Sequence, residues 1–317
     1  MLHRGRIAVC FTRSTGAATA RFTMLGRAGT HLAIALLKLS ALLPYGWIAR
    51  FGDAMGWLLY RIPNSRRRVV YTNLKLCFPQ WSDAQRERVA ERHFRHAIRS
   101  YVERSVQWFG SARKLERLIQ VDSAVDLRDP DLPPTLFLGA HFVGIEAGSI
   151  FLNHQLRRQC GALYQPMSNP LLDQVAVAAR ARFGADMASR ADSARIVLRW
   201  LRERKPVMLG ADMDYGMRNS VFVSFFGVPA CTLTAVGRLA KAGHAQLAPF
   251  ICEVLPDYKG YRLKIFAPWQ NYPSGDDVAD ARRMNAWLEQ EIARLPEQYY
   301  WVHKRFKTRP PGESGFY

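Results

Sequence analysis

The sequence predicts a three-layer α/β protein, a mixed central sheet flanked by helices, with an N-terminal membrane-associated helical segment. From about residue 135 onward, short apolar runs alternate with amphipathic segments, the order that produces a sheet covered by helices. Hydrophobic residues make up 49% of the 317 residues, enough to bury a large core. An apolar segment near the N-terminus precedes a basic cluster, as in peripheral membrane anchors.

Three regions follow from this pattern. Residues 1–23 contain four arginines and no acid, which predicts a basic extension. Residues 24–70 read as a membrane-associated apolar helix or hairpin with a basic flank. Residues 71–317 carry the remaining strands and helices and form the main domain.

The apolar segment 31–49 is interrupted by Lys38 and Pro44, so it is a poor single span on the criterion of ~20 apolar residues. A helix lying in the membrane interface, or a short re-entrant hairpin, fits better. Trp47 suits the depth of the lipid headgroups, and the basic run 66–68 suits anionic lipid. The alternative is a helical hairpin that packs on the main domain.

The formal net charge of +19 predicts an anionic partner, which could be nucleic acid, an anionic membrane or an acidic protein. No segment matches a nucleic-acid-binding module, so we expect no nucleic acid. The five cysteines are scattered and lack CxxC spacing. This pattern argues against a disulfide framework and against a zinc site, and it fits a reducing compartment.

The first long helix is predicted by a capping box at Ser82–Gln85 and an apolar stripe that reaches Val106. Its other face carries five arginines, most of which we expect in solvent. The strands expected are Thr135–Leu138, Cys160–Tyr164, Pro206–Ala211, Gln246–Leu255 and Tyr261–Trp269. The helices expected are Ile145–Leu152, Leu171–Phe183, Asp192–Glu203, Thr232–Ala242 with Thr232 as its N-cap, and Asp276–Leu295.

His141 and Glu146 are the candidate catalytic residues. A histidine beside a carboxylate can take a proton from a hydroxyl group, because the carboxylate fixes the imidazole tautomer and stabilises the imidazolium. No serine or cysteine nucleophile motif accompanies them, so the hydroxyl is expected on a substrate. The pair converges only if His141 lies in the turn after a strand and Glu146 in the first helical turn. The alternative is a core histidine beside an unrelated glutamate.

Further candidates lie at other strand ends. Asp212 follows the strand 206–211, and ligands of open α/β sheets gather beyond such ends, so Asp212 is expected near His141. Asp214 follows in an Asp-x-Asp turn that we interpret as orienting substrate rather than binding metal. Phe226 belongs to an apolar segment before Gly227 that could wall an acyl-chain channel or form ordinary core.

Four segments in this order resemble the bacterial lipid A biosynthesis acyltransferase family of the wider lysophospholipid acyltransferase-like superfamily. The resemblance extends from about residue 24 to 317. The segments are His141–Glu146, Tyr164–Pro170, Asp212–Gly216 with Phe225–Pro229, and Tyr300–Pro310.

This resemblance implies that residues 71–317 are an acyltransferase domain on the cytoplasmic face of the bacterial inner membrane. His141 would deprotonate a hydroxyl of a lipid A precursor, and Glu146 would orient His141. Arg190 would bind substrate phosphate or lie at the reaction centre, and Asp212 would hold Arg190 or shape the pocket. Asn169 would line the site. Asp214 and Phe226 are grouped with Asn169, Arg190 and Asp212 as the expected substrate-binding residues.

The resemblance also implies an acyl-acyl carrier protein as co-substrate and no metal or other cofactor. The expected partners are therefore acyl carrier protein, anionic inner-membrane lipid and the lipid A precursor. Two alternatives stay open: an acyltransferase acting on a lysophospholipid, aminolipid or other glycolipid, and a non-catalytic basic membrane-binding protein. A basic face could dock the acidic carrier protein, and its candidates are Arg180, Arg182, Lys304, Arg305, Lys307 and Arg309.

Overall fold

The computed structural model describes residues 24–190 and 193–317, so the predicted basic extension 1–23 lies outside the described residues. A seven-stranded sheet runs through the molecule in the order β1-β9-β8-β2-β5-β3-β4, and β6 and β7 form a separate hairpin. The strands are β1 (Ile119–Ser123), β2 (Thr135–Gly139), β3 (Gly161–Tyr164), β4 (Asp186–Ser189), β5 (Val207–Gly210), β6 (Ser220–Phe225), β7 (Val228–Leu233), β8 (Gln246–Val254) and β9 (Tyr261–Ile265).

Neighbouring strands of the large sheet are parallel, except that β8 and β9 are antiparallel. The sheet is therefore mixed, as predicted, and most of its strand pairs are parallel. The helices are α1 (Met24–Ser40), α2 (Tyr45–Arg61), α3 (Ser65–Cys77), α4 (Asp83–Val102), α5 (Arg104–Phe109), α6 (Ala112–Leu118), α7 (Ile145–Gln155), α8 (Pro170–Ala181), α9 (Ser193–Arg202), α10 (Ala235–Ala242) and α11 (Asp277–Arg294), with short 3₁₀ turns η2 (Pro256–Tyr258) and η3 (Pro296–Gln298).

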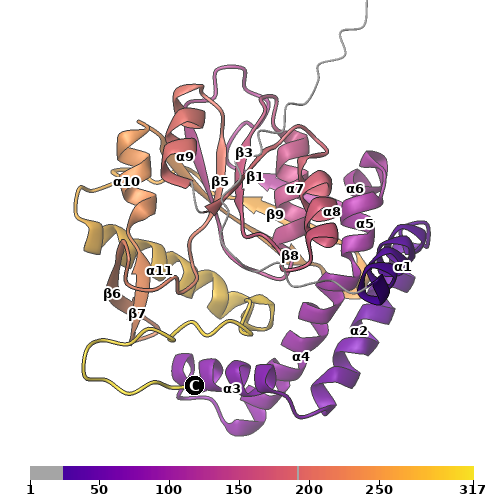
Figure 1. Cartoon of the computed structure of the whole chain (residues 1–317). Helices are drawn as coiled ribbons and strands as arrows, with labels where there is room; N and C mark the ends of the chain where they lie inside the picture. Colours follow the sequence, from indigo (N-terminus) through magenta and orange to yellow (C-terminus); the bar gives the residue numbers. More distant parts are fainter. Residues whose placement is uncertain (1–23, 191–192) are drawn as a thin grey trace, which may run out of the picture.

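Helices cover both faces of the sheet, with α9 and α10 on one side and α7 and α8 on the other (Figure 1). Side chains of β2 alternate between these layers, as the pleat of a strand requires. Phe137 packs in the cluster that contains Phe151 of α7. Leu136 and Leu138 pack with Trp200 of α9. The predicted central sheet with flanking helices is confirmed.

Several local predictions are confirmed and others are corrected. The capping box is present, since Ser82 and Gln85 exchange side-chain to backbone hydrogen bonds at the start of α4. Thr232 is not a helix cap, because it lies within β7, and Thr234 precedes α10 instead. The apolar segment around Phe226 is a hairpin turn, in which Phe226 and Gly227 both have positive φ. That backbone is typical of two-residue turns between antiparallel strands.

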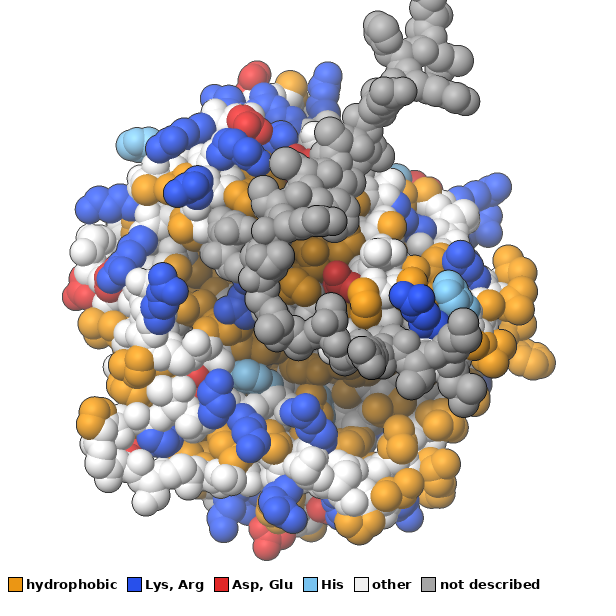
Figure 2. Space-filling view, viewed as in Figure 1, with side chains coloured by type: hydrophobic (Ala, Val, Ile, Leu, Met, Phe, Trp, Pro, Cys, Tyr) orange, Lys and Arg blue, Asp and Glu red, His pale blue; other side chains and the backbone are white. Residues whose placement is uncertain are grey.

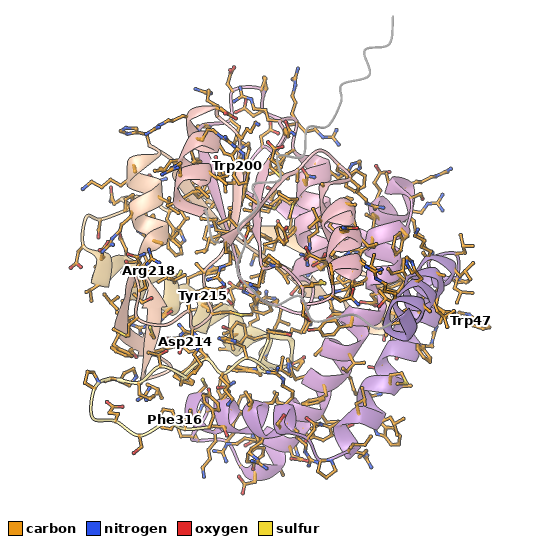
Figure 3. All side chains as sticks on the ribbon, in the orientation of Figure 1. Trp47, Trp200, Asp214, Tyr215, Arg218 and Phe316 are labelled. Carbon is orange, nitrogen blue, oxygen red and sulfur yellow. The ribbon has the colours of Figure 1, made fainter. Side chains whose placement is uncertain are left out.

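The N-terminal helices α1 and α2 lie side by side at one edge of the molecule (Figure 1). None of the helices in residues 24–190 and 193–317 combines the length and hydropathy needed to cross a bilayer. The two helices nevertheless expose apolar side chains to solvent, and Trp47 projects outward from α2 (Figure 3). Leu42 and Leu43 in the turn between the helices are exposed too, and we call the whole set the apolar face; its members are Leu32, Leu36, Leu39, Leu42, Leu43, Trp47, Phe51 and Leu58.

Two glycines bring the backbone of α2 against α4. A Cβ atom on Gly52 would lie 2.7 Å from the Cα of Arg99, and one on Gly56 would lie 2.5 Å from the Cα of Arg95. Both distances are shorter than real Cβ atoms allow, so α2 can lie this close only without side chains at these positions. Small residues four apart on a helix commonly permit such close contact between helices.

A buried polar network joins the same helices to the sheet. The guanidinium of Arg99 on α4 donates to Glu103 at 2.6 Å and to the hydroxyl of Tyr45 on α2 at 2.7 Å. Glu103 also accepts a hydrogen bond from the hydroxyl of Tyr261 on β9. Arg99 is therefore an exception to the solvated arginine face that the sequence predicts. A buried ion pair of this kind is costly to break, because either partner alone would leave an uncompensated charge.

We expect Gly56→Ala to lower the free energy of unfolding by about 1–3 kcal/mol, because the added methyl group overpacks the contact with α4. The matched control is Gly29→Ala in α1, where an added Cβ would meet nothing within 4 Å. That variant should gain up to about 1 kcal/mol from helix propensity. Urea unfolding measures both changes. Equal stability of wild type and Gly56→Ala would contradict the close contact.

Candidate active site

His141 and Asp212 meet at the carboxyl edge of the sheet. β2 ends at Gly139 and its parallel neighbour β5 ends at Gly210, and these two glycines are register partners. His141 follows β2 and Asp212 follows β5 by two residues each. The Nδ1 atom of His141 lies 2.5 Å from Oδ1 of Asp212, and the backbone N–H of His141 donates to Oδ2 at 2.9 Å. The expected proximity of the two residues is confirmed.

The electrostatics of this pair favour a carboxylate beside a basic imidazole. Burial raises the pKa of Asp212, but the charge and hydrogen bonds of His141 outweigh burial and hold that pKa below its usual value. Burial lowers the pKa of His141, and Asp212 overcomes it, so the net shift is upward despite the opposing charge of Arg190. An ionised carboxylate only accepts hydrogen bonds. The proton of neutral His141 therefore lies on Nδ1, and Nε2 is the basic nitrogen.

Gly210 makes room for the imidazole. A Cβ atom at this position would lie 2.6 Å from Cε1 and 3.2 Å from Nε2 of His141. Any side chain here would push the ring away from Asp212. The ring is further positioned through its own backbone, because Tyr300 donates its N–H to the carbonyl oxygen of His141 at 2.9 Å.

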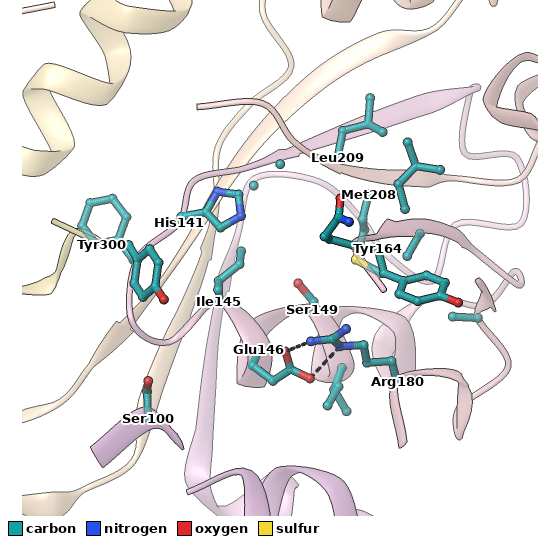
Figure 4. A pocket seen from close by; sticks show the side chains of 18 of the residues that line it. Ser100, His141, Ile145, Glu146, Ser149, Tyr164, Arg180, Met208, Leu209 and Tyr300 are labelled. Carbon is teal, nitrogen blue, oxygen red and sulfur yellow. Dashed lines mark hydrogen bonds and ion pairs between the residues drawn. The ribbon is translucent and has the colours of Figure 1, made fainter. Parts of the chain in front are cut away.

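Glu146 does not contact His141, and this corrects the role predicted for it. Its carboxylate accepts two hydrogen bonds from Arg180 of α8, at 2.8 and 2.7 Å, and one from the indole N–H of Trp108 at 2.8 Å. Glu146 lies in the first turn of α7, as predicted, but its side chain points toward α8, across the pocket from the imidazole (Figure 4). Asp212 takes the place beside His141 that Glu146 was expected to fill.

The pairing also fixes the charge of Glu146. Burial raises the pKa of this carboxyl, and the charges of Arg180 and Arg104 with the hydrogen bonds of Arg180 and Trp108 lower it further than burial raises it. The net shift is downward, so Glu146 is ionised at neutral pH. Two parallel N–H···O bonds between a guanidinium and a carboxylate hold both groups in one plane.

His141 and Glu146 line one cavity of about 420 Å³, a size in the range of small-molecule sites. Polar and apolar side chains share its lining, and the walls come from the sheet (β2, β3, β4, β5 and β8) and from the helices α4, α5, α7 and α8. The space-filling view shows hydrophobic side chains inside a hollow on this face (Figure 2). The apolar wall includes Ile150, Ala162, Ala185, Met187, Met208 and Phe250.

Asn169 and Asp214 are not among the residues that line this cavity, and each ties together separate segments of the chain. The side-chain oxygen of Asn169 caps α8 by accepting from two backbone N–H groups, and its amide donates to Thr30 of α1 at 2.8 Å. The carboxylate of Asp214 accepts hydrogen bonds from Thr308 and from the backbone N–H of Gly216. Asn169 thus ties α1 to α8, and Asp214 anchors the C-terminal segment.

Phe226 also lies outside the cavity lining. Its ring packs against Phe78 and Phe225, with centroids 4.9 and 5.0 Å away, which matches the core alternative rather than the channel wall. Arg190 stacks on the ring of Tyr215 at 3.6 Å. Arg190 is near enough to influence the pKa of His141, so it belongs to the margin of the site.

Arg180 and Trp108 were not predicted as site residues. Arg180 was assigned to a basic docking face, yet its guanidinium is bound to Glu146 inside the cavity. Arg182, another docking candidate, donates to the backbone carbonyls of Trp108 and Gly110. A third, Arg305, is buried. No sequence spacing links Arg180 to Glu146, since α7 and α8 meet only in the folded chain.

The chain matches the bacterial lipid A biosynthesis acyltransferase family over residues 17–308. It is 35% identical over 297 residues to a lipid A biosynthesis lauroyltransferase of Escherichia coli K12, covering 91% of this chain and 94% of that protein. A lipid A biosynthesis acyltransferase of Haemophilus influenzae is 32% identical over 283 residues, which are 88% and 90% of the two chains. The palmitoleoyltransferase of Escherichia coli K12 is 31% identical over 291 residues, or 91% and 94%. The chain therefore belongs to the bacterial lipid A biosynthesis acyltransferase family and is an acyltransferase.

Proposed function

We propose that this enzyme transfers a fatty acyl chain from an acyl-carrier-protein thioester to a hydroxyl group of a lipid A precursor. The observation that carries the proposal is the His141–Asp212 pair at the wall of a cavity with an apolar interior. The pair supplies a base for a hydroxyl, and the apolar wall suits a fatty chain. The relatives named for lipid A acylation support the choice of acceptor.

In this mechanism Nε2 of His141 takes the proton of the acceptor hydroxyl. Asp212 keeps the imidazole in the required tautomer and stabilises the imidazolium that forms. The acceptor oxygen attacks the thioester carbonyl carbon, so that a C–O bond forms and the C–S bond breaks. The imidazolium then returns its proton to the leaving thiolate. The acyl chain moves in one transfer, and no acyl-enzyme is formed.

We propose that Arg180 stabilises the negative charge that develops on the carbonyl oxygen of the thioester. It lines the same cavity as His141, and Glu146 binds its Nε and Nη2 atoms. Within the described part of the chain, Nη1 of Arg180 has no hydrogen-bond partner, so it is free to donate to an oxyanion. A preorganised donor of this kind contributes strongly to transition-state stabilisation. Glu146 would then act by holding Arg180.

We further propose that the apolar face of α1 and α2 docks on an anionic membrane, at the cytoplasmic side of the inner membrane. Trp47 is 70% exposed, and hydrophobic side chains gather at the edge formed by α1 and α2 (Figure 2). Arg61 at the end of α2 and Arg66 and Arg68 in the first turn of α3 are exposed. An apolar strip with flanking cations is the pattern of interfacial helices.

The central test is an assay of free-thiol release with purified protein, acyl-carrier-protein thioesters of graded length and a tetra-acylated lipid A precursor. Wild type should consume thioester only when the acceptor is present. His141→Ala should lower the rate about 10²- to 10⁴-fold, the usual contribution of a general base. Glu146→Gln and Arg180→Gln should also lose activity, whereas the exposed Arg92→Gln should not. Thioester hydrolysis without acceptor, or acylation of lysophospholipid alone, would refute the proposal.

We expect Asp212→Asn to shift the pH dependence of kcat/KM. A general base must be neutral, so the rate falls as pH drops through the folded pKa of His141, which Asp212 holds above its ordinary value of 6.5. Burial and the charge of Arg190 remain in the variant, and both lower that pKa. The acid limb should therefore move to lower pH while the maximal rate falls. Asp122→Asn, an exposed change on β1, is the control. An unmoved limb would contradict the assignment.

The double change Trp47→Ser with Phe51→Ser should weaken binding to vesicles of phosphatidylcholine and phosphatidylglycerol at least about 10-fold. Each large apolar side chain contributes roughly 1.5–3 kcal/mol when fully buried. The control is Val278→Ser on α11, an exposed apolar residue away from the apolar face. Vesicle cosedimentation measures the difference. Equal binding of the double variant and wild type would exclude this face as the docking surface.

A further inference from the structure

Arg104 is a cavity residue that the proposed mechanism does not use. It begins α5 and lines the cavity that contains His141 and Glu146. Across residues 24–190 and 193–317, no acid lies within 4.0 Å of its guanidinium and no hydrogen bond engages it. Its Nε atom is buried without a partner. Because a buried N–H donor without a partner is unfavourable and the rest of the guanidinium is unpaired, this group is suited to bind a ligand.

The neighbouring acids are already engaged by other residues. Glu103, the adjacent residue, is bound by Arg99 and by the hydroxyl of Tyr261. Glu146 already accepts three hydrogen bonds, two from Arg180 and one from Trp108. Arg104 influences the charge of Glu146 from a distance but makes no ion pair with it. The guanidinium therefore keeps its full donor capacity for a molecule in the cavity.

Aromatic rings hold Arg104 in place without using its N–H groups. The guanidinium lies over the ring of Tyr101 at 4.3 Å and near the ring of Trp108 at 5.5 Å. Cation–π contacts fix the plane of an arginine while its edge stays available. The hydroxyls of Tyr101 and Tyr300 lie 2.7 Å apart, and both residues line the same cavity. Arg104 and this hydroxyl pair, in which one hydroxyl donates to the other, thus form one polar cluster.

This cluster lies at the solvent side of the cavity. Tyr101 is 42% exposed, whereas Phe250 at the apolar wall is 1% exposed. A substrate that places its fatty chain against the apolar wall would leave its polar part near Tyr101. Both proposed substrates carry phosphate in their polar part. The thioester donor has a phosphodiester in its phosphopantetheine arm, and the lipid acceptor has phosphomonoesters. A planar guanidinium matches phosphate oxygens in a bidentate manner.

We propose that Arg104, with the hydroxyls of Tyr101 and Tyr300, binds a phosphoryl group of a substrate at the open end of the cavity. The inference rests on the proposed function and adds to it a positioning residue for substrate phosphate. It makes Arg104 responsible for affinity, because Arg104 is not among the groups that shift the pKa of His141 and has no hydrogen bond to His141 or Asp212. Replacing Arg104 is therefore expected to raise KM and to weaken equilibrium binding, with little change in kcat.

The experiment compares substrates with and without phosphate in wild type, Arg104→Gln and Arg104→Lys. The donor arm uses dodecanoyl-phosphopantetheine and dodecanoyl-pantetheine thioesters, and the acceptor arm uses the lipid A precursor with and without its phosphates. Arg104→Gln should raise KM about 10- to 100-fold for one phosphate-bearing substrate, either the donor or the acceptor, as expected for losing charge-assisted hydrogen bonds. Arg104→Lys should fall between, since it keeps the charge but not the bidentate edge.

The decisive quantity is coupling between the side chain and the phosphate. Removing phosphate from the substrate should raise KM in wild type and should raise it far less in Arg104→Gln. The arm that shows this coupling identifies the donor or the acceptor as the source. Arg92→Gln, which removes one exposed positive charge from α4, should leave every KM unchanged. The proposal would be overturned if Arg104→Gln raised KM equally for the substrates with and without phosphate in both the donor and the acceptor comparison. It would also be overturned if the variant raised no KM at all.

A binding measurement separates this inference from the proposed function. Two proteins are compared, His141→Ala and the double variant that also carries Arg104→Gln. Each is titrated with the unreactive dodecanoyl-phosphopantetheine amide and with the intact lipid precursor. Weaker binding of either phosphate ligand on loss of Arg104 supports the phosphate site even if no thioester is turned over. Unchanged binding of both refutes it even if the enzyme is active. Melting curves exclude unfolding, and Arg104→Lys repeats the test should Arg104→Gln not fold.

Discussion

The hydrogen bond between His141 and Asp212 is the constraint on which the site depends. It exists because β2 and β5 are parallel neighbours in register, so that the residues following Gly139 and Gly210 emerge at the same edge of the sheet. Gly210 leaves room for the ring, and the carboxylate accepts both the backbone and the side-chain N–H of His141. Removal of any of these conditions would change the tautomer or the position of the base. The strand pairing thus sets the chemistry.

The sequence could identify His141 but not its partner. Glu146 lies five residues away, and a local carboxylate was the natural candidate; Asp212 lies 71 residues away and reaches the imidazole only through the pairing of β2 with β5. The general rule that ligands gather beyond strand ends did predict that His141 and Asp212 would be close. It could not predict which acid makes the bond, because that depends on how α7 leaves its first turn and on Arg180, which arrives from another helix.

The same distinction holds for the fold. The buried strands and the long helices have strong periodicity, and they were predicted with ends shifted by a few residues. The edge strands β1 and β4 were not predicted, because an edge strand needs no continuous apolar run; β1 exposes its three central residues. The β6–β7 hairpin was missed because Phe226 and Gly227 form its turn where asparagine–glycine is the usual signal. The contacts of Asn169 with α1 and of Asp214 with the C-terminal segment could not be predicted either, because each joins residues far apart in the sequence.

The charged groups that line the cavity differ in whether they have a charged partner, and this difference indicates different roles. Arg180 and Glu146 neutralise each other through two hydrogen bonds, so this pair can be desolvated when a fatty chain enters without leaving an isolated charge. Arg104 has no such partner among the described residues and lies toward the exposed Tyr101. A compensated pair suits the dry interior, where an unpaired cation would be most costly, and an uncompensated cation suits the wet end, where the anionic headgroup of the proposed substrate would lie. With the His141–Asp212 base on the wall of the same cavity, this gradient would orient an amphipathic substrate, chain inward and phosphate outward, before any bond is made.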